Sequence, residues 1–292
     1  MKKQNKAGLF VLIGNPVEHS VSPAMFNAAF RHRKLWQYIY FTLRLEKDEL
    51  RWFVKAFKKL NFIGANVTIP HKVEITKHLD SLHDSALRAG AVNVIAKRRG
   101  KTIGYNTDAL AVVKVLENVC KRRGLAIVLG CGGAARAAAV ALDTLRFESQ
   151  VFVGRSTGRI RDMHEFLKSR RINGSVININ ERSKLNNLLE VCDLVINATP
   201  VGMYPHVEET ILDSSRIRPG VVVFDMVYNP PETRLLREAK AAGAVTVGGL
   251  DMLVKQAEEA YSIWLDCKAP SKIMYEVAAG MLARFNVENI SR

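Results

Sequence analysis

One stretch near the middle of the chain constrains the fold more than any other. It runs from Gly124 to Arg136 and reads GLAIVLGCGGAAR. Its apolar first half has no polar alternation, which suits a strand buried on both faces, as in a parallel sheet. The glycines that follow allow a tight turn, and the alanine-rich end begins a helix whose N–H groups can bind a diphosphate. The stretch predicts a dinucleotide-binding turn of the form G-x-G-x-x-A, with a purely structural turn as the alternative.

The segments after this turn repeat the alternation of strand and helix. Short apolar strands are expected, with helical patterns between them, at residues 151–154, 176–179, 194–198, 221–226 and 244–247. This alternation is typical of a doubly wound parallel sheet, because helical crossovers join parallel strands. We therefore predict an α/β fold in which residues 109–248 form a Rossmann-like nucleotide-binding domain.

The residues before this domain predict another α/β domain, placed at residues 1–108. Its strands are expected at residues 10–13, 36–45, 64–69, 91–96 and 102–105. Ser22 before Pro23 has the form of a helix N-cap followed by proline at the first helical position, and Pro70 opens a further expected helix. Two helices are expected at the C-terminal end, at residues 249–265 and 271–284.

Composition narrows the class of protein. The chain has 292 residues, of which 48% are hydrophobic and 24% charged, as in ordinary soluble globular proteins. The four cysteines are far apart and form no C-x-x-C pair, which favours a reducing compartment over a disulfide framework or a zinc site. No stretch approaches membrane-spanning length, and the apolar run near the N-terminus lacks a signal-peptide cleavage site. We therefore expect a cytoplasmic protein with no membrane partner.

The net charge of +15 raises nucleic acid as a partner. However, the basic residues are spread along the chain, and the densest runs, at 97–101 and 121–123, fall at an expected turn and an expected helix end. A basic surface that attracts anionic small molecules explains this pattern better. We expect a small-molecule substrate, no nucleic-acid partner, and a monomer or homodimer.

The residues after the second strand of the nucleotide domain predict the cofactor. An acidic residue there usually binds the ribose 2′-hydroxyl of NAD. This chain instead reads GRSTGR over residues 154–159, with no carboxylate and with Arg155 and Arg159 in its place. Because a guanidinium suits a 2′-phosphate, we predict NADP. Surface arginines in a loop are the alternative.

Two residues are candidates for proton handling. Lys72 follows Pro70, so in the first turn of the expected helix its ammonium group would lie near the positive end of the helix dipole. This lowers the pKa of a lysine towards what proton transfer needs, although a flexible surface lysine fits the local sequence equally well. Asp108 follows Asn106-Thr107, and its local sequence favours a plain helix N-cap.

Ser20 and Ser22 offer hydroxyl donors at a helix start, where a carboxylate can be held. Capping alone explains Ser22 but not Ser20. The seven histidines show no metal-ligand spacing, and no G-x-S-x-G nucleophile motif occurs, so no metal is predicted.

Taken together, these stretches resemble the shikimate dehydrogenase family. The matching motifs run in family order from about residue 12 to beyond residue 260: GNPVEHSVSP (14–23), GANVTIPHK (64–72), GAVN (90–93), GYNTD (104–108), GCGGAAR (130–136), NATPVGM (197–203), DMVYNP (225–230) and GGLDMLVKQ (248–256). The segments NVTIPHK and HSVSP are highly specific in combination.

The resemblance implies an NADPH-dependent, reversible reduction of 3-dehydroshikimate to shikimate in the biosynthesis of chorismate and the aromatic amino acids. It implies that Lys72 and Asp108 form the catalytic pair in an interdomain cleft, and that residues 249–292 complete the first, substrate-binding domain. The implied substrate-binding residues are Ser20, Ser22, Thr68, Asn93, Tyr228 and Gln256. The implied cofactor-binding residues are Gly130, Cys131, Gly132, Gly133, Ala134, Arg155, Ser156, Arg159, Met226 and Gly249.

Three positions depart from the family pattern. Phe26 stands where histidine is frequent, Ala109 where glycine is usual, and Gly154 where asparagine precedes the arginine. The last is expected to weaken contacts on the adenine side of the cofactor. A quinate/shikimate dehydrogenase that uses NAD is the nearest alternative, and a catalytically silent NADP-binding regulator is an alternative of another class. Retention of both Lys72 and Asp108 argues against the regulator.

Overall fold

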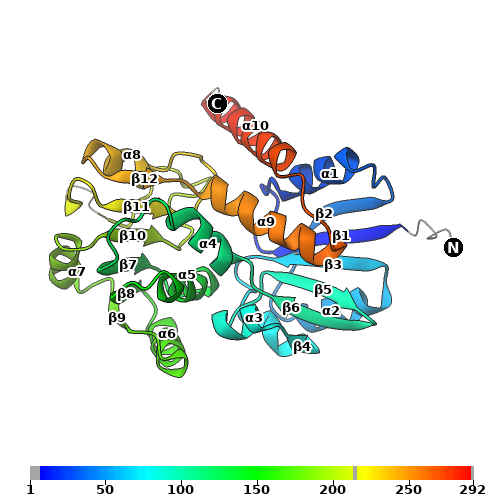
Figure 1. Cartoon of the computed structure of the whole chain (residues 1–292), viewed down its shortest axis with the longest axis horizontal. Coiled ribbons are helices and arrows are strands. Elements are labelled where there is room, and N and C mark those ends of the chain that lie inside the picture. Colours follow the sequence, from blue (N-terminus) through cyan, green and yellow to red (C-terminus); the bar gives the residue numbers. More distant parts are fainter. Residues whose placement is uncertain (1–6, 213–215, 291–292) are drawn as a thin grey trace. The chain divides into compact units, whose positions relative to one another are not determined.

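The computed structural model describes residues 7–212 and 216–290, without the side chains of 285–290. These residues divide into two compact units, whose helices and strands are labelled in Figure 1. The first unit comprises the described residues up to Thr107 together with those from Val254 onward, and the second comprises Asp108–Leu253. The chain thus passes between units one residue before the boundary expected after 108, and again within a helix that begins at Gly249.

The first unit contains a mixed six-stranded sheet. Its strands are β1 (Gly8–Gly14), β2 (Tyr38–Arg44), β3 (Phe62–Val67), β4 (Ser81–Leu82), β5 (Val94–Arg98) and β6 (Lys101–Tyr105), in the order β2-β1-β3-β5-β6-β4. Strands β1, β2 and β3 are parallel, whereas β5 runs antiparallel to both β3 and β6. The expected strand pair around residues 99–100 is confirmed. Both turn residues have positive φ, Arg99 at 50° and Gly100 at 78°, which suits the twist of a two-residue hairpin.

Aromatic residues fill one side of this sheet. Phe26 of α1 (Ser22–His32) stacks on Tyr40 of β2, with ring centroids 4.5 Å apart. Trp264, near the end of α9 (Gly249–Leu265), packs against Phe10 and Phe26, and its indole Nε1–H donates to the Ile95 carbonyl at 3.0 Å. A Cβ on Gly64 would lie 2.3 Å from the same indole, so only glycine fits beneath it. The C-terminal part of α9 is thereby fixed to the sheet of the first unit.

Helices on the two sides of this sheet have different partners. The helix α10 (Ser271–Ile290) packs against α1. On the other side, α2 (Leu50–Lys59) buries Leu50, Phe53, Val54 and Phe57 in a core that includes β1 and β3 residues. A short 3₁₀ helix, η1 (Glu74–His78), and α3 (Asp84–Ala89) complete the unit up to residue 107.

The outer edge of β2 is covered at its centre by a side chain. Asn27 of α1 accepts a hydrogen bond from the Tyr40 N–H and donates one to the Tyr40 carbonyl, both at 2.8 Å. The Asn27 amide therefore takes the place of a neighbouring strand at that residue, where β2 has no strand beyond it.

The second unit contains six parallel strands. They are β7 (Leu125–Leu129), β8 (Ser149–Gly154), β9 (Gly174–Asn178), β10 (Leu194–Asn197), β11 (Val222–Asp225) and β12 (Val245–Val247). Their order, β12-β11-β10-β7-β8-β9, is the 3-2-1-4-5-6 order of dinucleotide-binding folds. The helices are α4 (Asp108–Leu116), α5 (Gly133–Thr144), α6 (Thr157–Arg170), α7 (Arg182–Leu189) and α8 (Arg234–Ala241). The expected doubly wound sheet is confirmed, and its order reverses between β7 and β10, where such folds bind ligands.

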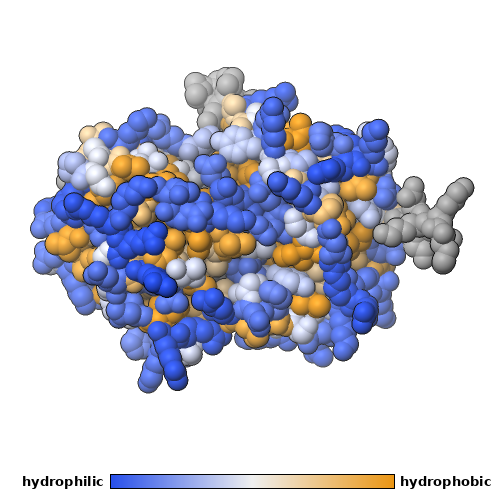
Figure 2. Space-filling view, in the orientation of Figure 1, coloured by the Kyte–Doolittle hydropathy of each residue, from blue (hydrophilic) through white to orange (hydrophobic). Residues whose placement is uncertain are grey.

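On the face drawn in Figure 2, hydrophilic side chains cover much of the surface, with apolar patches between them. Within residues 7–212 and 216–290, no helix combines the length and the apolar character that a membrane crossing requires.

Two local expectations are wrong. No α-helix opens at Pro70, since residues 69–73 form turns before η1 begins at Glu74. The N-cap of α1 is Val21 rather than Ser22, and Ser22 is the first helical residue. Both errors have causes in hydrogen bonds, described below.

Candidate functional site

The turn that carries Lys72 is fixed by contacts with distant segments. It follows β3, and the Thr68 N–H donates to the Ile13 carbonyl at 2.9 Å. The Lys72 carbonyl accepts the Val92 N–H at 2.7 Å, while the Thr76 N–H bonds to Val73. Because the Lys72 carbonyl is engaged by Val92, which precedes β5, it does not accept the N–H four residues on, as an α-helix requires. The helix-dipole argument for Lys72 therefore has no basis in the fold, and Lys72 owes its place to long-range backbone bonds.

His71, beside Lys72, is a fixing residue that the sequence analysis missed. Its ring is buried, and Nε2 lies 2.8 Å from the carbonyl of Leu45, the residue that follows β2. Since a carbonyl only accepts, Nε2 carries the proton and donates. This bond ties the Lys72 turn to a third segment of the first unit.

Asn93 brings together residues far apart in the sequence. Its amide donates to the Thr107 hydroxyl at 2.8 Å and to the Gln256 side chain at 3.3 Å, and its oxygen accepts the Thr107 N–H at 2.8 Å. The Thr107 hydroxyl in turn donates to the Gln256 carbonyl at 3.0 Å. Because Val67 N–H donates to the Asn93 carbonyl, this cluster adjoins the turn of Thr68 and Lys72. Four predicted residues of the first unit, Thr68, Lys72, Asn93 and Gln256, thus lie in one connected region.

The loop with Ser20 and Ser22 adjoins the same region. Asn15 N–H donates to the Ile69 carbonyl at 2.8 Å, which joins the start of this loop to the Lys72 turn. The Ser22 N–H donates to Ser20 Oγ at 3.2 Å, so Ser20, and not Ser22, makes the local bond at the helix start. Ser22 itself is buried. A hydroxyl that accepts a hydrogen bond can still donate its own proton to an anion.

The remaining predicted catalytic and substrate residues belong to the second unit. Asp108 is buried and is the first residue of α4, so it lies within the helix and is not the residue preceding it. Tyr228 follows β11. Met226 and Gly249 meet, because a Cβ on Gly249 would lie 2.6 Å from the carbonyl oxygens of both Met226 and Val227. Glycine at the start of α9 thus permits a close approach of two backbones.

The glycine turn has the geometry expected of a diphosphate cradle. Gly130 has φ of 116°, and a Cβ there would lie 3.1 Å from the Ala198 carbonyl oxygen. Gly132 is the N-cap of α5, and nothing lies within 4 Å of a Cβ built on it. The backbone of residues 130–134 therefore presents the N-terminal end of α5 with little side-chain cover, which suits an anionic ligand.

Cys131 fills space beside Gly154. A Cβ on Gly154 would lie 2.9 Å from Cys131 Sγ and 2.5 Å from Ile160 Cγ1. Glycine at this position is therefore matched to the cysteine, which gives Cys131 a packing role. Burial raises the pKa of the Cys131 thiol to about 11, so the thiol is neutral at pH 7.

The basic residues after β8 are exposed. Arg155, Ser156 and Arg159 are all exposed, and Ser156 is the N-cap of α6. Arg159 is near enough to Cys131 to influence its thiol electrostatically, which places it beside the glycine turn. The end of β8 thus joins two guanidinium groups to a helix N-terminus, the features that a phosphate ester needs. Among the residues that the structure describes, no group of three potential metal ligands occurs.

Comparisons with known proteins agree with these features. Residues 12–95 match the family model of the shikimate dehydrogenase substrate binding domain, and residues 249–278 match that of the shikimate 5′-dehydrogenase C-terminal domain. A shikimate dehydrogenase (NADP(+)) of Dehalococcoides mccartyi is 38% identical over 92% of this chain and 94% of its own. The chain belongs to the shikimate dehydrogenase family.

Solved structures of the family superpose over nearly the whole chain. A shikimate dehydrogenase crystallised with NADP⁺ has a TM-score of 0.84 at 35% identity, covering 94% of this chain and 96% of its own. A Thermus thermophilus shikimate 5-dehydrogenase in complex with NADP(H) and shikimate has a TM-score of 0.81 at 30% identity, covering 94% and 100%. The predicted family and the two-domain α/β fold are confirmed.

Proposed function

We propose that this chain is an NADP-dependent shikimate dehydrogenase, which reversibly reduces 3-dehydroshikimate to shikimate on the route to chorismate. The observation that carries the proposal is the sequence identity to shikimate dehydrogenases over nearly the whole chain. The candidate catalytic, substrate-binding and cofactor-binding residues are also present in the two units. The first unit would bind the substrate and the second the cofactor. NADPH, when bound, would supply the hydride for the reduction, and NADP⁺ would accept it in the reverse direction.

The residues of the second unit fit NADP. The uncovered turn at 130–134 holds the diphosphate with its backbone N–H groups, and Arg155, Ser156 and Arg159 hold the 2′-phosphate. A guanidinium pairs with a phosphate through two parallel hydrogen bonds, whereas the 2′-hydroxyl of NAD offers no charge to pair. Met226 and Gly249 flank the nicotinamide.

Residues of both units act on the substrate. Ser20, Ser22 and Tyr228 hold its carboxylate, and Thr68, Asn93 and Gln256 contact the ring oxygens. Lys72 donates a hydrogen bond or a proton to the ketone oxygen as it becomes a hydroxyl, and Asp108 orients the lysine and the substrate. The hydrogen bonds around Asn93 restrain its amide before the substrate arrives, which reduces the entropy lost on binding.

A spectrophotometric assay of the purified protein tests the proposal. Four pairings are compared: shikimate or quinate as substrate, each with NADP or NAD. We expect the highest kcat/KM with shikimate and NADP. A higher kcat/KM with quinate and NAD would favour a quinate dehydrogenase activity. The absence of turnover with every pairing would refute the proposal that the protein is an enzyme of this kind.

Two further properties are proposed. A reducing, cytoplasmic location is supported by the four cysteines, all of which are free of disulfides. The oligomeric state is proposed to be a monomer or homodimer, which light scattering after size-exclusion chromatography measures directly.

A further inference from the structure

A buried carboxylate lies at the end of β11, outside the residues assigned so far. Asp225 is 0% exposed and accepts three hydrogen bonds. Asn197 Nδ2 and the Val227 N–H both donate to Oδ1 at 2.9 Å, and the Thr233 hydroxyl donates to Oδ2 at 2.6 Å. The donors come from the end of β10, the loop after β11, and the residue that precedes α8.

Each of these donors is itself fixed. The Asn197 side-chain oxygen accepts from both the Thr199 N–H, at 3.1 Å, and the Thr199 hydroxyl, at 2.7 Å. These bonds orient the Asn197 amide so that its NH₂ group faces Asp225.

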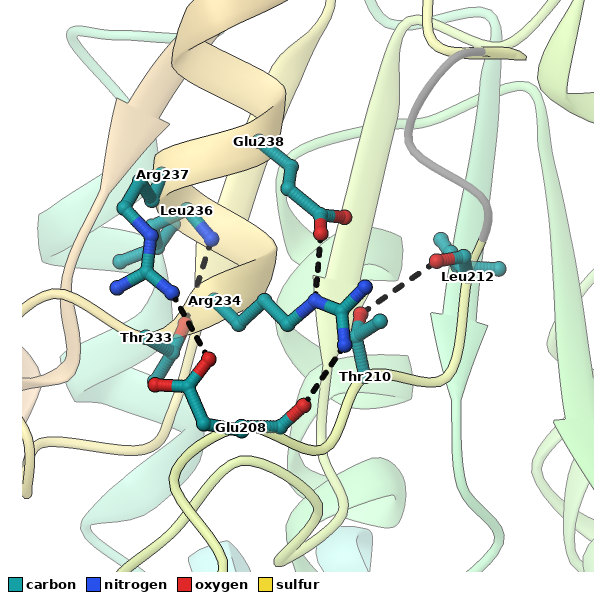
Figure 3. A network of polar contacts seen from close by, with 8 residues as sticks. All are labelled: Glu208, Thr210, Leu212, Thr233, Arg234, Leu236, Arg237 and Glu238. Atoms are coloured by element: carbon teal, nitrogen blue, oxygen red, sulfur yellow. Dashed lines mark hydrogen bonds and ion pairs between the residues drawn. The ribbon is translucent and has the colours of Figure 1, made fainter.

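Thr233 is fixed at the start of α8. It is the N-cap of that helix, where its Oγ1 accepts the Leu236 N–H at 3.3 Å. Figure 3 shows the surrounding contacts: Arg234 bonds to Glu238 and to the Glu208 carbonyl, and Arg237 bonds to the Glu208 carboxylate. The Asp225 carboxylate therefore joins elements that are already held in place.

A neutral amide does not reproduce the hydrogen bonds of this carboxylate. Burial raises the pKa of Asp225 to about 6, which shows that its charge is carried at a cost. An amide of the same shape keeps one acceptor oxygen for the Asn197 and Val227 donors, but its NH₂ group would stand in place of Oδ2 and could not accept the Thr233 hydroxyl proton. Only an ionised carboxylate accepts all three hydrogen bonds as the structure has them.

What Asp225 holds is the loop of Met226, Val227 and Tyr228. Asp225 accepts the Val227 N–H, and the Met226 N–H donates to the Asn197 carbonyl at 3.0 Å. On its other side the loop lies against the Gly249 backbone. The loop is thus held between β10 and the start of α9. The Asp225 carboxylate fixes the Val227 backbone within it.

We propose that Asp225 is a positioning residue, which holds the 226–228 loop where hydride transfer takes place. The proposal rests on the proposed function, in which Met226 flanks the nicotinamide and Tyr228 holds the substrate carboxylate. Hydride transfer depends steeply on the distance between donor and acceptor carbons, and a displacement of about 1 Å costs on the order of 100-fold in rate. The adenosine end of the cofactor is held elsewhere, by Arg155 and Arg159.

The experiment compares Asp225→Asn with wild type in shikimate oxidation. We expect kcat to fall about 10- to 100-fold while the KM for NADP stays within about twofold, because the cofactor's main anchors are untouched. The primary deuterium isotope effect, measured with stereospecifically deuterated NADPH in the reverse direction, should rise, since hydride transfer becomes more rate-limiting. A general loss of folded protein would lower the active fraction without raising the isotope effect.

Matched variants isolate the carboxylate. Asp193→Asn is the control, since it changes another aspartate of the same unit. Asp193 lies just before β10, and its Oδ2 accepts the Gly124 N–H at 2.9 Å. This variant should leave kcat unchanged. Thr233→Val removes one donor and should lower kcat about three- to tenfold, whereas Thr233→Ser should restore it. Thr233→Val also provides the test if Asp225→Asn does not fold.

The outcomes separate the two proposals. Wild-type turnover of shikimate, with an unchanged kcat and isotope effect in Asp225→Asn and Thr233→Val, would overturn the positioning role and leave the proposed function standing. Equal losses in Asp193→Asn would also overturn it. A wild-type protein without turnover would overturn both proposals.

Discussion

Two turns of this chain carry candidate residues of the proposed reaction, and they are built in opposite ways. The turn at 68–72 in the first unit is held by backbone bonds to Ile13 and Val92 and by the His71 side chain. The turn at 130–134 in the second unit is shaped by what glycine lacks, with a positive φ at Gly130 and open space around Gly132. The first turn orients a side chain, and the second exposes a backbone.

The difference explains what each turn reveals in the sequence. The glycine turn depends on residues next to one another, so its strand, glycines and helix start can be recognised locally. The Lys72 turn depends on Val92, whose N–H takes the carbonyl that an α-helix would have used. No local pattern contains that bond.

The largest expected effect comes from a change in the Lys72 turn. Lys72→Ala should lower kcat by about 10²- to 10⁴-fold, because it removes the group that is proposed to bond to the substrate oxygen as charge develops there. Steady-state kinetics with shikimate and NADP provide the measurement. The KM for shikimate should change far less than kcat.

The control for Lys72 is Lys77→Ala, since Lys77 is an exposed lysine that pairs with Glu74. It should retain wild-type turnover. Equal losses of kcat and of shikimate binding in Lys72→Ala would remove the transition-state role from this turn.

The next largest effect concerns the arginines beside the glycine turn at 130–134. Arg155→Ala should raise the KM for NADP by about 10- to 100-fold, because a charge-assisted bond to the 2′-phosphate is lost. The KM for NAD should hardly change. Arg161→Ala, at an exposed position of α6, which begins two residues after Arg155, is the matched control. An unchanged KM for NADP in Arg155→Ala would refute the 2′-phosphate assignment.

A smaller effect tests the glycines themselves. Gly130→Ala should lower the free energy of unfolding by about 1 to 3 kcal/mol and weaken NADP binding, because alanine is strained at φ of 116° and its Cβ meets the Ala198 carbonyl. Gly132→Ala places its Cβ in open space at φ of −94° and should leave stability nearly unchanged. Chemical denaturation and cofactor titration measure both. Equal stability of the two variants would show that conformation does not select glycine at 130.

The smallest effect is a pH dependence in the first unit. Bonds from Lys58, and then from Thr102, lower the pKa of Asp80 from 3.8 to about 2. A carboxyl whose pKa is lowered in the folded state stabilises it above the unfolded pKa, and this contribution is lost as the pH falls from about 4 through 2. Asp80→Asn should therefore lower Tm slightly at pH 7 and by less at pH 2.

Asp48→Asn, a change at an exposed aspartate of the same unit, serves as its comparison and should track wild type across this range. A constant difference in Tm between Asp80→Asn and wild type from pH 7 to pH 2 would contradict the assigned ion pair.

Much of the fold could be predicted from the sequence. The parallel sheet of the second unit follows from repeated apolar strands, and the bounds of α9, Gly249–Leu265, match the predicted helix. The start of α1 could not be predicted, because the bond between Ser22 N–H and Ser20 Oγ shifts the first helical residue. Ser22 as an N-cap was therefore wrong, as was the helix at Pro70.

The candidate residues were found through family motifs more than through local physics. The local sequence left Asp108 as a helix cap, and the structure buries it in the first turn of α4. Asp225 lies within the motif DMVYNP but carries no local sign of function, since its three donors come from separate segments. The fixing role of His71 also has no local sign in the sequence, because its hydrogen-bond partner, the Leu45 carbonyl, is remote in the chain. The assigned roles of the site residues stay predictions.

The amide of Asn27, which binds both backbone groups of Tyr40, has a consequence for self-association. A second copy that added a strand alongside β2 would have to displace this amide and forfeit two hydrogen bonds at the middle of the edge. The Asn27 side chain blocks these backbone groups, so extension of the sheet by a strand of a second molecule is disfavoured at this point of β2. A homodimer that keeps the Asn27 bonds therefore cannot form by pairing a strand with the Tyr40 backbone of β2.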